Sequence, residues 1–249
     1  MENRLSTILQ EHYNELVQAY EGLNLYINKD GPSYVRGKLK FSVQDGQITI
    51  DDAFEMELLI PENYPSDPPV VFETGGRIPE GFHKYSDKSL CLGTPLEIRM
   101  KFKKNPTLLA FTREQIIPFL YSFCYYEKYG RMPYGEHAHG GQGILESYKH
   151  IFHTNSDIST LGLLKILAEN NYRGHHDCPC GSGKKLRNCH GDQILEIIKY
   201  QNQVQFIEDY IRSVVFFKES GYDLPEALYS EKIMKHFSKK VMPKIEKKT

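Results

Sequence analysis

The chain has 249 residues, of which 40% are hydrophobic and 25% are charged, and its formal net charge is −1. This composition is typical of a globular protein with room for one good core and a small appendage. No apolar run approaches the roughly 18–20 residues that cross a bilayer, and the polar N-terminus lacks the hydrophobic stretch of a signal peptide. We therefore expect a cytoplasmic protein with no membrane segment. The near-neutral charge argues against nucleic acid as the main partner.

The first half of the chain predicts a helix followed by a meander of strands. Apolar residues recur at helical spacing over residues 4–21, and the period changes to two over residues 34–43. Asp45-Gly46 is a hairpin turn signal, because both residues tolerate positive φ. A return strand is expected over residues 54–60 and a third strand over residues 70–73. This order of elements indicates an α+β fold.

The middle and the end of the chain predict a long loop and further helices. Periodicity is lost between residues 75 and 105, a stretch too long for a simple connection. Thr112 to Gln115 reads as a capping box that opens a helix through residue 123, although Pro118 must kink that helix or displace its start. The glycine- and histidine-rich residues 135–143 are expected to form another loop. The other helices are expected at residues 143–152, at residues 157–170 and, as one long helix, at residues 194–214.

Cysteine usage indicates a metal site and a reactive thiol. The five cysteines are an odd number, and three of them fall within twelve residues, which argues against a secreted disulfide framework. The cluster consists of Cys178, Cys180, Cys189 and His190, and a Gly-Ser-Gly turn lies between its two close pairs. Three thiolates and one imidazole can complete a closed tetrahedron around a structural zinc ion. Metal binding would also supply the folding energy of so small a knuckle.

This segment is very similar to the SEC-C motif, a zinc knuckle. The resemblance covers only about fifteen residues, but its ligand spacing is specific. It implies a structural Zn²⁺ with no open coordination position, in a knuckle that recruits a protein or a nucleic acid. His175 and His176, just upstream, are spare ligand candidates that we expect to be surface residues. The tail from residue 231 to 249 carries seven lysines against two glutamates, and we interpret it as a solvated helix end, with an acidic or nucleic-acid contact as the alternative.

A second constellation lies in the first half of the chain. The run Tyr64-Pro-Ser-Asp-Pro-Pro-Val-Val-Phe72 is followed by Leu90-Cys91-Leu92, and His83 stands between the two. Three prolines in six residues stiffen the exit from a strand, and an X-Pro bond among them can be cis. Cys91 lies in the long aperiodic loop among polar and cationic residues, where a thiol can act as a nucleophile. Cys124, by contrast, stands between aromatic residues on an apolar helix and is predicted to be a core residue.

The order of helix, meander, Tyr-Pro-x-x-Pro-Pro, histidine, Cys-Leu and apolar helix resembles a ubiquitin-conjugating enzyme over about residues 1–127. In such a UBC-like fold, an antiparallel β-meander is flanked by helices, and the Pro-Pro element packs beside the loop of the catalytic cysteine. Phe102 and Pro106 stand roughly where the family often has a tryptophan and a proline. We therefore expect a ubiquitin-conjugating-enzyme-like domain at residues 1–172, and the zinc knuckle with C-terminal helices at residues 173–249.

The resemblance implies that Cys91 carries a ubiquitin-like protein as a thioester and passes it to a target amine, with an activating enzyme as the donor. His83 matches the histidine of the family's His-Pro-Asn motif. Lys84 and Tyr85 follow it, so the asparagine credited with stabilising the oxyanion has no counterpart, and Glu127 is only a late candidate for a catalytic carboxylate. His139 could fold back and provide an imidazole.

The pattern is most similar to prokaryotic relatives, several of which belong to anti-phage defence or ubiquitin-like conjugation operons. A signalling nucleotidyltransferase is a target by that analogy alone. Two other interpretations stay open at this point. One is a non-catalytic binding module, in which an inactive domain docks a ubiquitin-like protein and the knuckle recruits something else. The other is a nucleic-acid or ribosome-associated adaptor that uses the knuckle and the lysine-rich tail.

Overall fold

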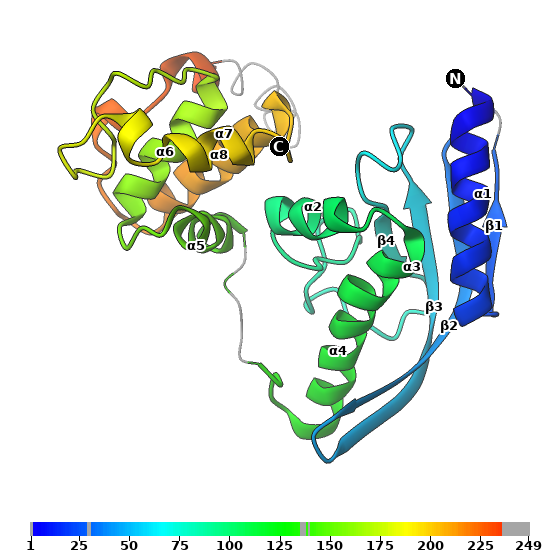
Figure 1. The fold of residues 1–249 in the computed structure, drawn as a ribbon. Helices are drawn as coiled ribbons and strands as arrows, with labels where there is room; N and C mark the ends of the chain where they lie inside the picture. Colours follow the sequence, from blue (N-terminus) through cyan, green and yellow to red (C-terminus); the bar gives the residue numbers. More distant parts are fainter. Residues whose placement is uncertain (1, 29–30, 135–137, 139, 236–249) are drawn as a thin grey trace, which may run out of the picture. The chain divides into compact units, whose positions relative to one another are not determined.

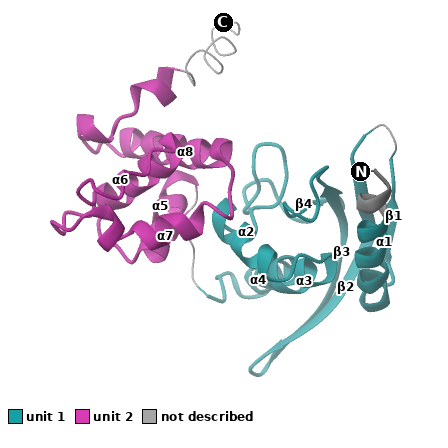
Figure 2. Ribbon diagram, turned by 45° about the horizontal axis from the view of Figure 1, so that its top comes forward, with its two compact units in different colours: residues 1–136 teal, residues 137–249 magenta. Residues whose placement is uncertain are grey.

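The computed structural model describes residues 2–28, 31–134, 138 and 140–235. The chain forms two compact units, residues 1–136 and residues 137–249 (Figure 2). The first is an α+β unit built on a four-stranded antiparallel sheet, and the second contains helices and the cysteine cluster. The predicted α+β class is confirmed.

The sheet of the first unit is a simple meander. Its strands β1 (Leu23–Tyr26), β2 (Ser33–Asp45), β3 (Ile48–Ile60) and β4 (Val70–Glu73) lie in the order β1-β2-β3-β4, and all neighbours are antiparallel. The predicted turn joins β2 to β3, which pair from Asp45 opposite Ile48 to Ser33 opposite Ile60. Alternate side chains on β2 and β3 are buried, as the period of two predicts. Strand β1 is a short element that the sequence patterns did not predict.

Helices complete the first unit (Figure 1). Helix α1 (Glu2–Ala19) lies beside β1, and α3 (Leu108–Phe111) and α4 (Ile117–Tyr129) lie against the sheet. Helix α2 (Pro95–Lys104) occupies the end of the segment that was predicted to be a loop. Its weak amphipathicity explains the wrong prediction, since only Leu96 and Phe102 are buried.

The helix predicted from Thr112 begins earlier and contains a π-helical turn. Its N-cap is Thr107, whose side chain accepts a hydrogen bond from the amide of Ala110. Helix α3 continues through a π turn at Thr112–Ile116 directly into α4. The Ile117 amide donates to the carbonyl of Thr112, five residues back, and this re-registration lies just before Pro118, which has no amide hydrogen to donate. The predicted capping box is therefore wrong.

The second unit contains helices α5 (Gly140–Phe152), α6 (Asp157–Glu169), α7 (Gly191–Ile197) and α8 (Gln203–Glu219), with short 3-10 helices at Leu186–Asn188 and Glu226–Leu228. Helices α5, α6 and α8 pack on one another around buried aromatic and aliphatic side chains. The compact units therefore divide between residues 136 and 137, earlier than the predicted domain boundary at residues 172 and 173. The physical reason is that α5 and α6 share a core with α8.

Two further helix predictions are corrected. Residues 140–143 begin α5 rather than ending a loop. The long helix predicted over residues 194–214 is two helices, because Asn202 starts α8 with a capping box that it forms with Gln205. Hydrophobic spacing alone continues across this break, so the pattern hid it.

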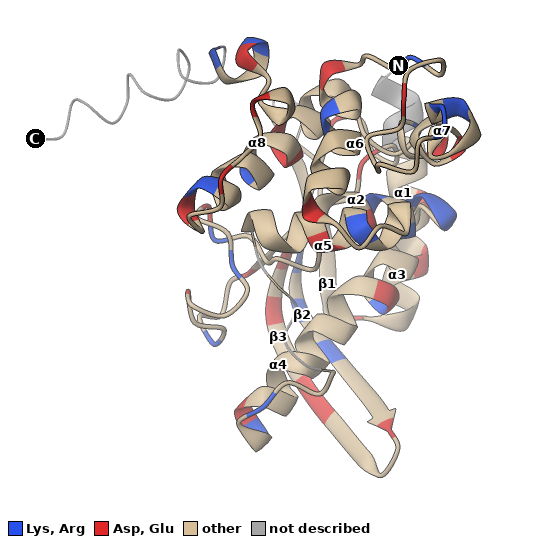
Figure 3. Cartoon of the chain, turned by 90° about the vertical axis from the view of Figure 1, so that its left-hand side faces the viewer, with Lys and Arg blue, Asp and Glu red and all other residues tan. Residues whose placement is uncertain are grey.

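The distribution of charged residues along the chain agrees with the near-neutral composition. Lysine and arginine are interspersed with aspartate and glutamate along the ribbon (Figure 3). In the described part of the chain, every helix is too short or too polar to cross a membrane.

Candidate thiol and metal sites

Cys91 lies at the end of a small antiparallel ribbon, residues 83–91, which we call the thiol ribbon. The Tyr85 amide donates to the Ser89 carbonyl at 2.9 Å, and the Cys91 amide donates to the His83 carbonyl at 2.7 Å. The turn between the two arms contains Lys88 at a φ of 71°. The side chain of Asp87 accepts hydrogen bonds from the hydroxyl and the amide of Ser89, which hold the pKa of Asp87 below its usual value. The thiol ribbon is thus an ordered element within the long segment between β4 and α2.

Main-chain and side-chain contacts attach the thiol ribbon to the sheet. The Leu90 amide donates to the Val71 carbonyl of β4 at 2.7 Å, and the Leu90 side chain is buried. Cys91 follows at once and is only half-buried, with its Sγ 3.7 Å from the carbonyl oxygen of Gly93. The residue is therefore only partly buried, while its backbone is held in place.

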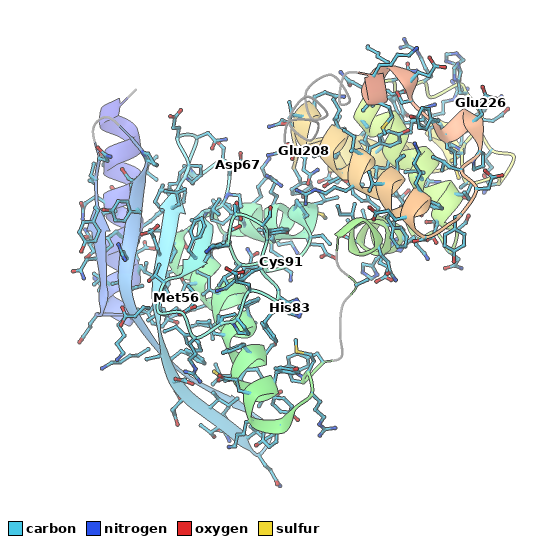
Figure 4. The ribbon with its side chains drawn as sticks, turned by 180° about the vertical axis from the view of Figure 1, so that it is seen from behind. Met56, Asp67, His83, Cys91, Glu208 and Glu226 are labelled. Carbon is cyan, nitrogen blue, oxygen red and sulfur yellow. The ribbon has the colours of Figure 1, made fainter. Side chains whose placement is uncertain are left out.

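His83 lies on the same ribbon as Cys91 (Figure 4). It has a φ of 43°, and its ring packs edge-to-face on Phe82 and Phe119 at centroid distances of 4.7 and 6.3 Å. His139, the other candidate imidazole, lies outside the described residues. Glu127 is paired with Arg77, whose Nη2 is 2.6 Å from its Oε2.

The proline run is held next to helix α2. Arg99 of α2 places its Nε 3.3 Å from Oδ1 of Asp67, which is labelled in Figure 4. Tyr64 packs on Phe102 of α2 with a centroid distance of 6.1 Å, and its hydroxyl lies 2.6 Å from Nδ1 of His12. The Tyr64-Pro65 peptide bond is cis, one of the X-Pro bonds for which the sequence allowed this isomer.

The cations near Cys91 have structural partners. The Lys84 ammonium points inward to the carboxylate of Glu73, with Nζ 3.6 Å from Oε2, and donates to the Ile78 carbonyl at 2.6 Å. Lys88 is exposed and lies 3.3 Å from Glu80. Sequence reasoning missed Glu73, although the alternation in β4 places it on the buried side with Val71, a position where a carboxylate needs a partner.

Cys124 is a core residue, as predicted. It is buried on α4, and its Sγ lies 3.2 Å from Oδ2 of Asp52. Burial and this carboxylate raise the pKa of the Cys124 thiol to about 12. A thiol so hard to ionise is a poor nucleophile.

The four predicted metal ligands converge in the second unit. The ligand atoms of Cys178, Cys180, Cys189 and His190 all lie within 4.8 Å of one another. His190 Nδ1 is 3.1 Å from the sulfur of Cys178 and 3.3 Å from that of Cys189, and the sulfurs of Cys180 and Cys189 are 3.5 Å apart. A tetrahedron with metal–sulfur distances of about 2.3 Å has edges of about 3.8 Å. The cluster is therefore compatible with a metal ion.

The backbone of the cluster and its neighbours also fit a metal. Nε2 of His190 lies 3.0 Å from the Phe152 carbonyl oxygen, which can only accept, so the proton belongs on Nε2 and Nδ1 is left free to coordinate. Sequence analysis could not find this contact, because any residue has a carbonyl. Gly181 and Gly183 have φ values of 75° and 72°, which favour glycine in the turn between the cysteine pairs.

The knuckle is closed by main-chain bonds between its two arms. The Cys178 amide donates to the Lys184 carbonyl, and the Leu186 amide donates to the His176 carbonyl, both at 2.9 Å. Burial raises the pKa of Cys178 to about 12, and a bound metal would displace its proton, because the ligand is the thiolate. The spare candidates His175 and His176 are exposed and lie outside the cluster.

Residues 177–192 match the SEC-C motif. The predicted likeness to this motif is thus confirmed for the knuckle. No curated protein and no solved structure matches the chain.

Proposed function

We propose that the first unit is a ubiquitin-conjugating-like carrier, which holds a ubiquitin-like protein as a thioester on Cys91. The observation that carries this proposal is a half-buried cysteine at the end of an anchored ribbon. A carrier cysteine must be open to a large incoming protein and held still for transfer. Cys124 in the same unit is buried on α4 and does not meet the first requirement.

The arrangement around Cys91 supports the same proposal. The first unit begins with an N-terminal helix and a four-stranded antiparallel meander, in which the proline run leads into the last strand. The thiol ribbon and an apolar helix follow, which is the order expected for a ubiquitin-conjugating enzyme. The proline run contacts α2, the helix that directly follows Cys91, through the Asp67–Arg99 ion pair. Phe102, at the position compared with the family's tryptophan, is buried against Tyr64 of that run.

The reaction is a pair of acyl transfers. The Cys91 thiolate attacks the carbonyl carbon of the thioester on an activating enzyme; a new C–S bond forms, and the activating enzyme's sulfur leaves and takes up a proton. A target amine then attacks the Cys91 thioester, loses a proton and forms an amide, while the Cys91 sulfur leaves. His83, or His139, would donate to the oxyanion. An oxyanion donor is worth roughly 2.7–4 kcal/mol, so the missing asparagine would slow aminolysis more than loading.

The test is a loading assay with an activating enzyme, ATP and a ubiquitin-like protein. We expect the chain to gain the mass of the ubiquitin-like protein in a bond that a reducing agent cleaves. Cys91→Ala should abolish the adduct, and Cys124→Ala should retain it. The activating enzyme must first be shown to load its own cysteine. The carrier proposal fails if such an enzyme leaves the wild-type chain unmodified.

A non-catalytic binding module is the second candidate. It is favoured by Tyr85, which stands two residues after His83, at the position of the motif's asparagine. The Tyr85 hydroxyl is directed to the Gly93 carbonyl oxygen at 3.5 Å, so this position does not supply the amide donor of the motif. In that case the chain would bind the ubiquitin-like protein without forming an adduct, and Cys91→Ala would bind it equally well. Titration calorimetry with both chains separates the two functions.

For the second unit we propose a structural zinc knuckle held by Cys178, Cys180, Cys189 and His190. Zinc bound by four protein side chains has no position for water or substrate, so the ion would stabilise the fold. We propose that the knuckle recruits a partner of the carrier, such as the protein target; a signalling nucleotidyltransferase is the candidate by analogy with prokaryotic relatives. Metal analysis should find about one zinc per chain, and Cys180→Ser should remove it while unit 1 stays folded.

A further inference from the structure

A buried ion pair connects the thiol ribbon to strand β4. The side chain of Glu73 is 1% exposed and that of Lys84 is 8% exposed, and Lys84 Nζ lies 3.6 Å from Glu73 Oε2. Charges buried to this degree are costly to desolvate unless they are paired and hydrogen-bonded. We therefore asked which contacts of the Glu73–Lys84 pair offset this cost.

Both members of the pair are also bonded to the segment that leads to the thiol ribbon. Glu73 accepts hydrogen bonds from the amide of Arg77 at 3.3 Å and from the amide of Ile78 at 3.2 Å. Lys84 donates to the Ile78 carbonyl at 2.6 Å. A Cβ atom on Gly75 would lie 2.9 Å from Glu73 Oε1, so glycine at this position leaves room for the carboxylate. The ion pair and these hydrogen bonds therefore tie Arg77, Ile78 and Lys84 to the end of β4.

Lys84 lies between the two hydrogen bonds of the thiol ribbon. It is bridged to Leu90, and the flanking His83 carbonyl and Tyr85 amide bond to Cys91 and Ser89. Its side chain fixes one arm of the ribbon, while the Leu90 amide bonded to Val71 fixes the other. Both arms are thus anchored to one strand, β4, and Cys91 emerges directly from the second arm.

We propose that Glu73 and Lys84 are positioning residues for Cys91, acting as a clamp that holds the thiol ribbon against β4. Neither residue touches the reacting sulfur; they act through the backbone of the ribbon. The role in transfer rests on the proposed carrier function, whereas the clamp itself does not.

The first test measures the stability of the thiol ribbon and does not depend on thioester transfer. Glu73→Gln and Lys84→Met should each raise the hydrogen-exchange rates of the Tyr85, Leu90 and Cys91 amides by about tenfold or more, and should speed alkylation of Cys91 by iodoacetamide. Amide exchange in β2 and β3, and alkylation of the buried Cys124, should stay at wild-type rates. The effects should be non-additive in the double variant, because both single changes release the same clamp.

The matched control is Glu80→Gln. This change breaks the Glu80–Lys88 pair in the same loop, where both side chains are at least 74% exposed, and it should leave the Leu90 and Cys91 amides unchanged. Exchange at these amides equal to wild type in Glu73→Gln would overturn the clamp. So would faster alkylation of Cys124 in step with Cys91, since this would show general unfolding. If Lys84→Met does not fold, Glu73→Gln alone tests the clamp. This variant is expected to fold, because the glutamine oxygen can still accept a hydrogen bond from the amide of Arg77 or Ile78.

The second test uses the loading assay. Both variants should load Cys91 more slowly by about tenfold at saturating activating enzyme, with little change in KM, because a misplaced nucleophile lowers the rate of the chemical step. If the wild-type chain does not load at all, the carrier proposal fails while the exchange experiment still decides the clamp. If the wild type loads and both variants load equally fast, the clamp does not position Cys91.

Discussion

In the first unit, Arg77 forms ion pairs with two carboxylates. Its Nη1 is 2.7 Å from Oδ1 of Asp52 and its Nη2 is 2.6 Å from Oε2 of Glu127. The guanidinium lies over the ring of Phe54, 4.5 Å from the centroid. Arg77 thus joins β3 to the end of α4, from the loop that leads to the thiol ribbon.

We predict that Arg77→Met lowers the free energy of unfolding of the first unit by about 1 kcal/mol at pH 7, a modest value because the three side chains are partly exposed. The hydrogen bond from Arg77 lowers the pKa of Asp52. A carboxyl group with a lowered pKa stabilises the fold above its usual pKa, and the contribution is lost as pH falls through the lowered value. The difference between wild type and Arg77→Met should therefore shrink below about pH 4, as measured by urea unfolding at several pH values.

Asp52→Asn is the companion variant. This variant keeps the size of the side chain. The difference between its free energy of unfolding and that of the wild type should also shrink as the pH falls. A difference from wild type that stays constant from pH 7 to pH 3 would contradict the role of the Asp52 charge.

At the residue scale, the sequence identified residues whose own chemistry suggests a role. It missed residues whose role depends on a partner elsewhere in the chain. Cys91, Cys124 and the four metal-ligand candidates were chosen as cysteine or histidine in a telling local context. The alternation in β4 places Glu73 on the buried side, but it does not identify the partner. The partners of Glu73 and Arg77 come from other parts of the chain. A pairing between residues distant in the chain leaves no local signal.

At the scale of elements, the junction of α3 and α4 shows two threonines in contrasting roles. Thr107 caps α3, with its Oγ1 3.1 Å from the Ala110 amide nitrogen. Thr112 lies inside the continuous helix, and among the described residues its buried Oγ1 has no hydrogen-bond partner. Threonine is a common N-cap residue, and the sequence predicted this role for Thr112. The structure gives it to Thr107.

We predict opposite outcomes for the same substitution at these two positions. Thr107→Val should lower the free energy of unfolding by about 1 kcal/mol, because the cap is lost. Thr112→Val should be neutral or stabilising, since it replaces an unsatisfied buried hydroxyl with a methyl group of similar shape. Chemical denaturation of the two variants provides the measurement, and each serves as the control for the other. If Thr112→Val lowers the free energy of unfolding more than Thr107→Val does, Thr112 is the N-cap, as the sequence predicted.

At the scale of the whole molecule, each unit has its own core. The sheet and helices α1 to α4 enclose one cluster of buried side chains, and all of its members precede residue 126. In the second unit the knuckle is tied to α5 by the contact of His190 with the Phe152 carbonyl. Pro179 also packs closely on α6, where a Cβ on Gly162 would come within 2.7 Å of it.

Removal of the proposed zinc ion should therefore act on one unit only. We predict that a chelator lowers the melting temperature of the second unit by about 5 °C or more and increases amide exchange over residues 174–198. The exchange rates of β2 and β3 should not change. Readdition of zinc should reverse the effect, and His190→Ala should reproduce it without chelator. Equal destabilisation of both units would contradict their independence.

The sequence by itself determined the features with a local physical cause. Alternation set the faces of β2 and β3, Asp45-Gly46 set the hairpin, and the spacing of Cys178, Cys180, Cys189 and His190 indicated the metal cluster. Tertiary structure alone decided where α2 lies, where the units divide and how Cys91 is anchored. Those outcomes depend on contacts between residues far apart in the chain, such as Glu73 with Lys84 and Asp67 with Arg99. The energies of such contacts exist only once the chain has brought their members together.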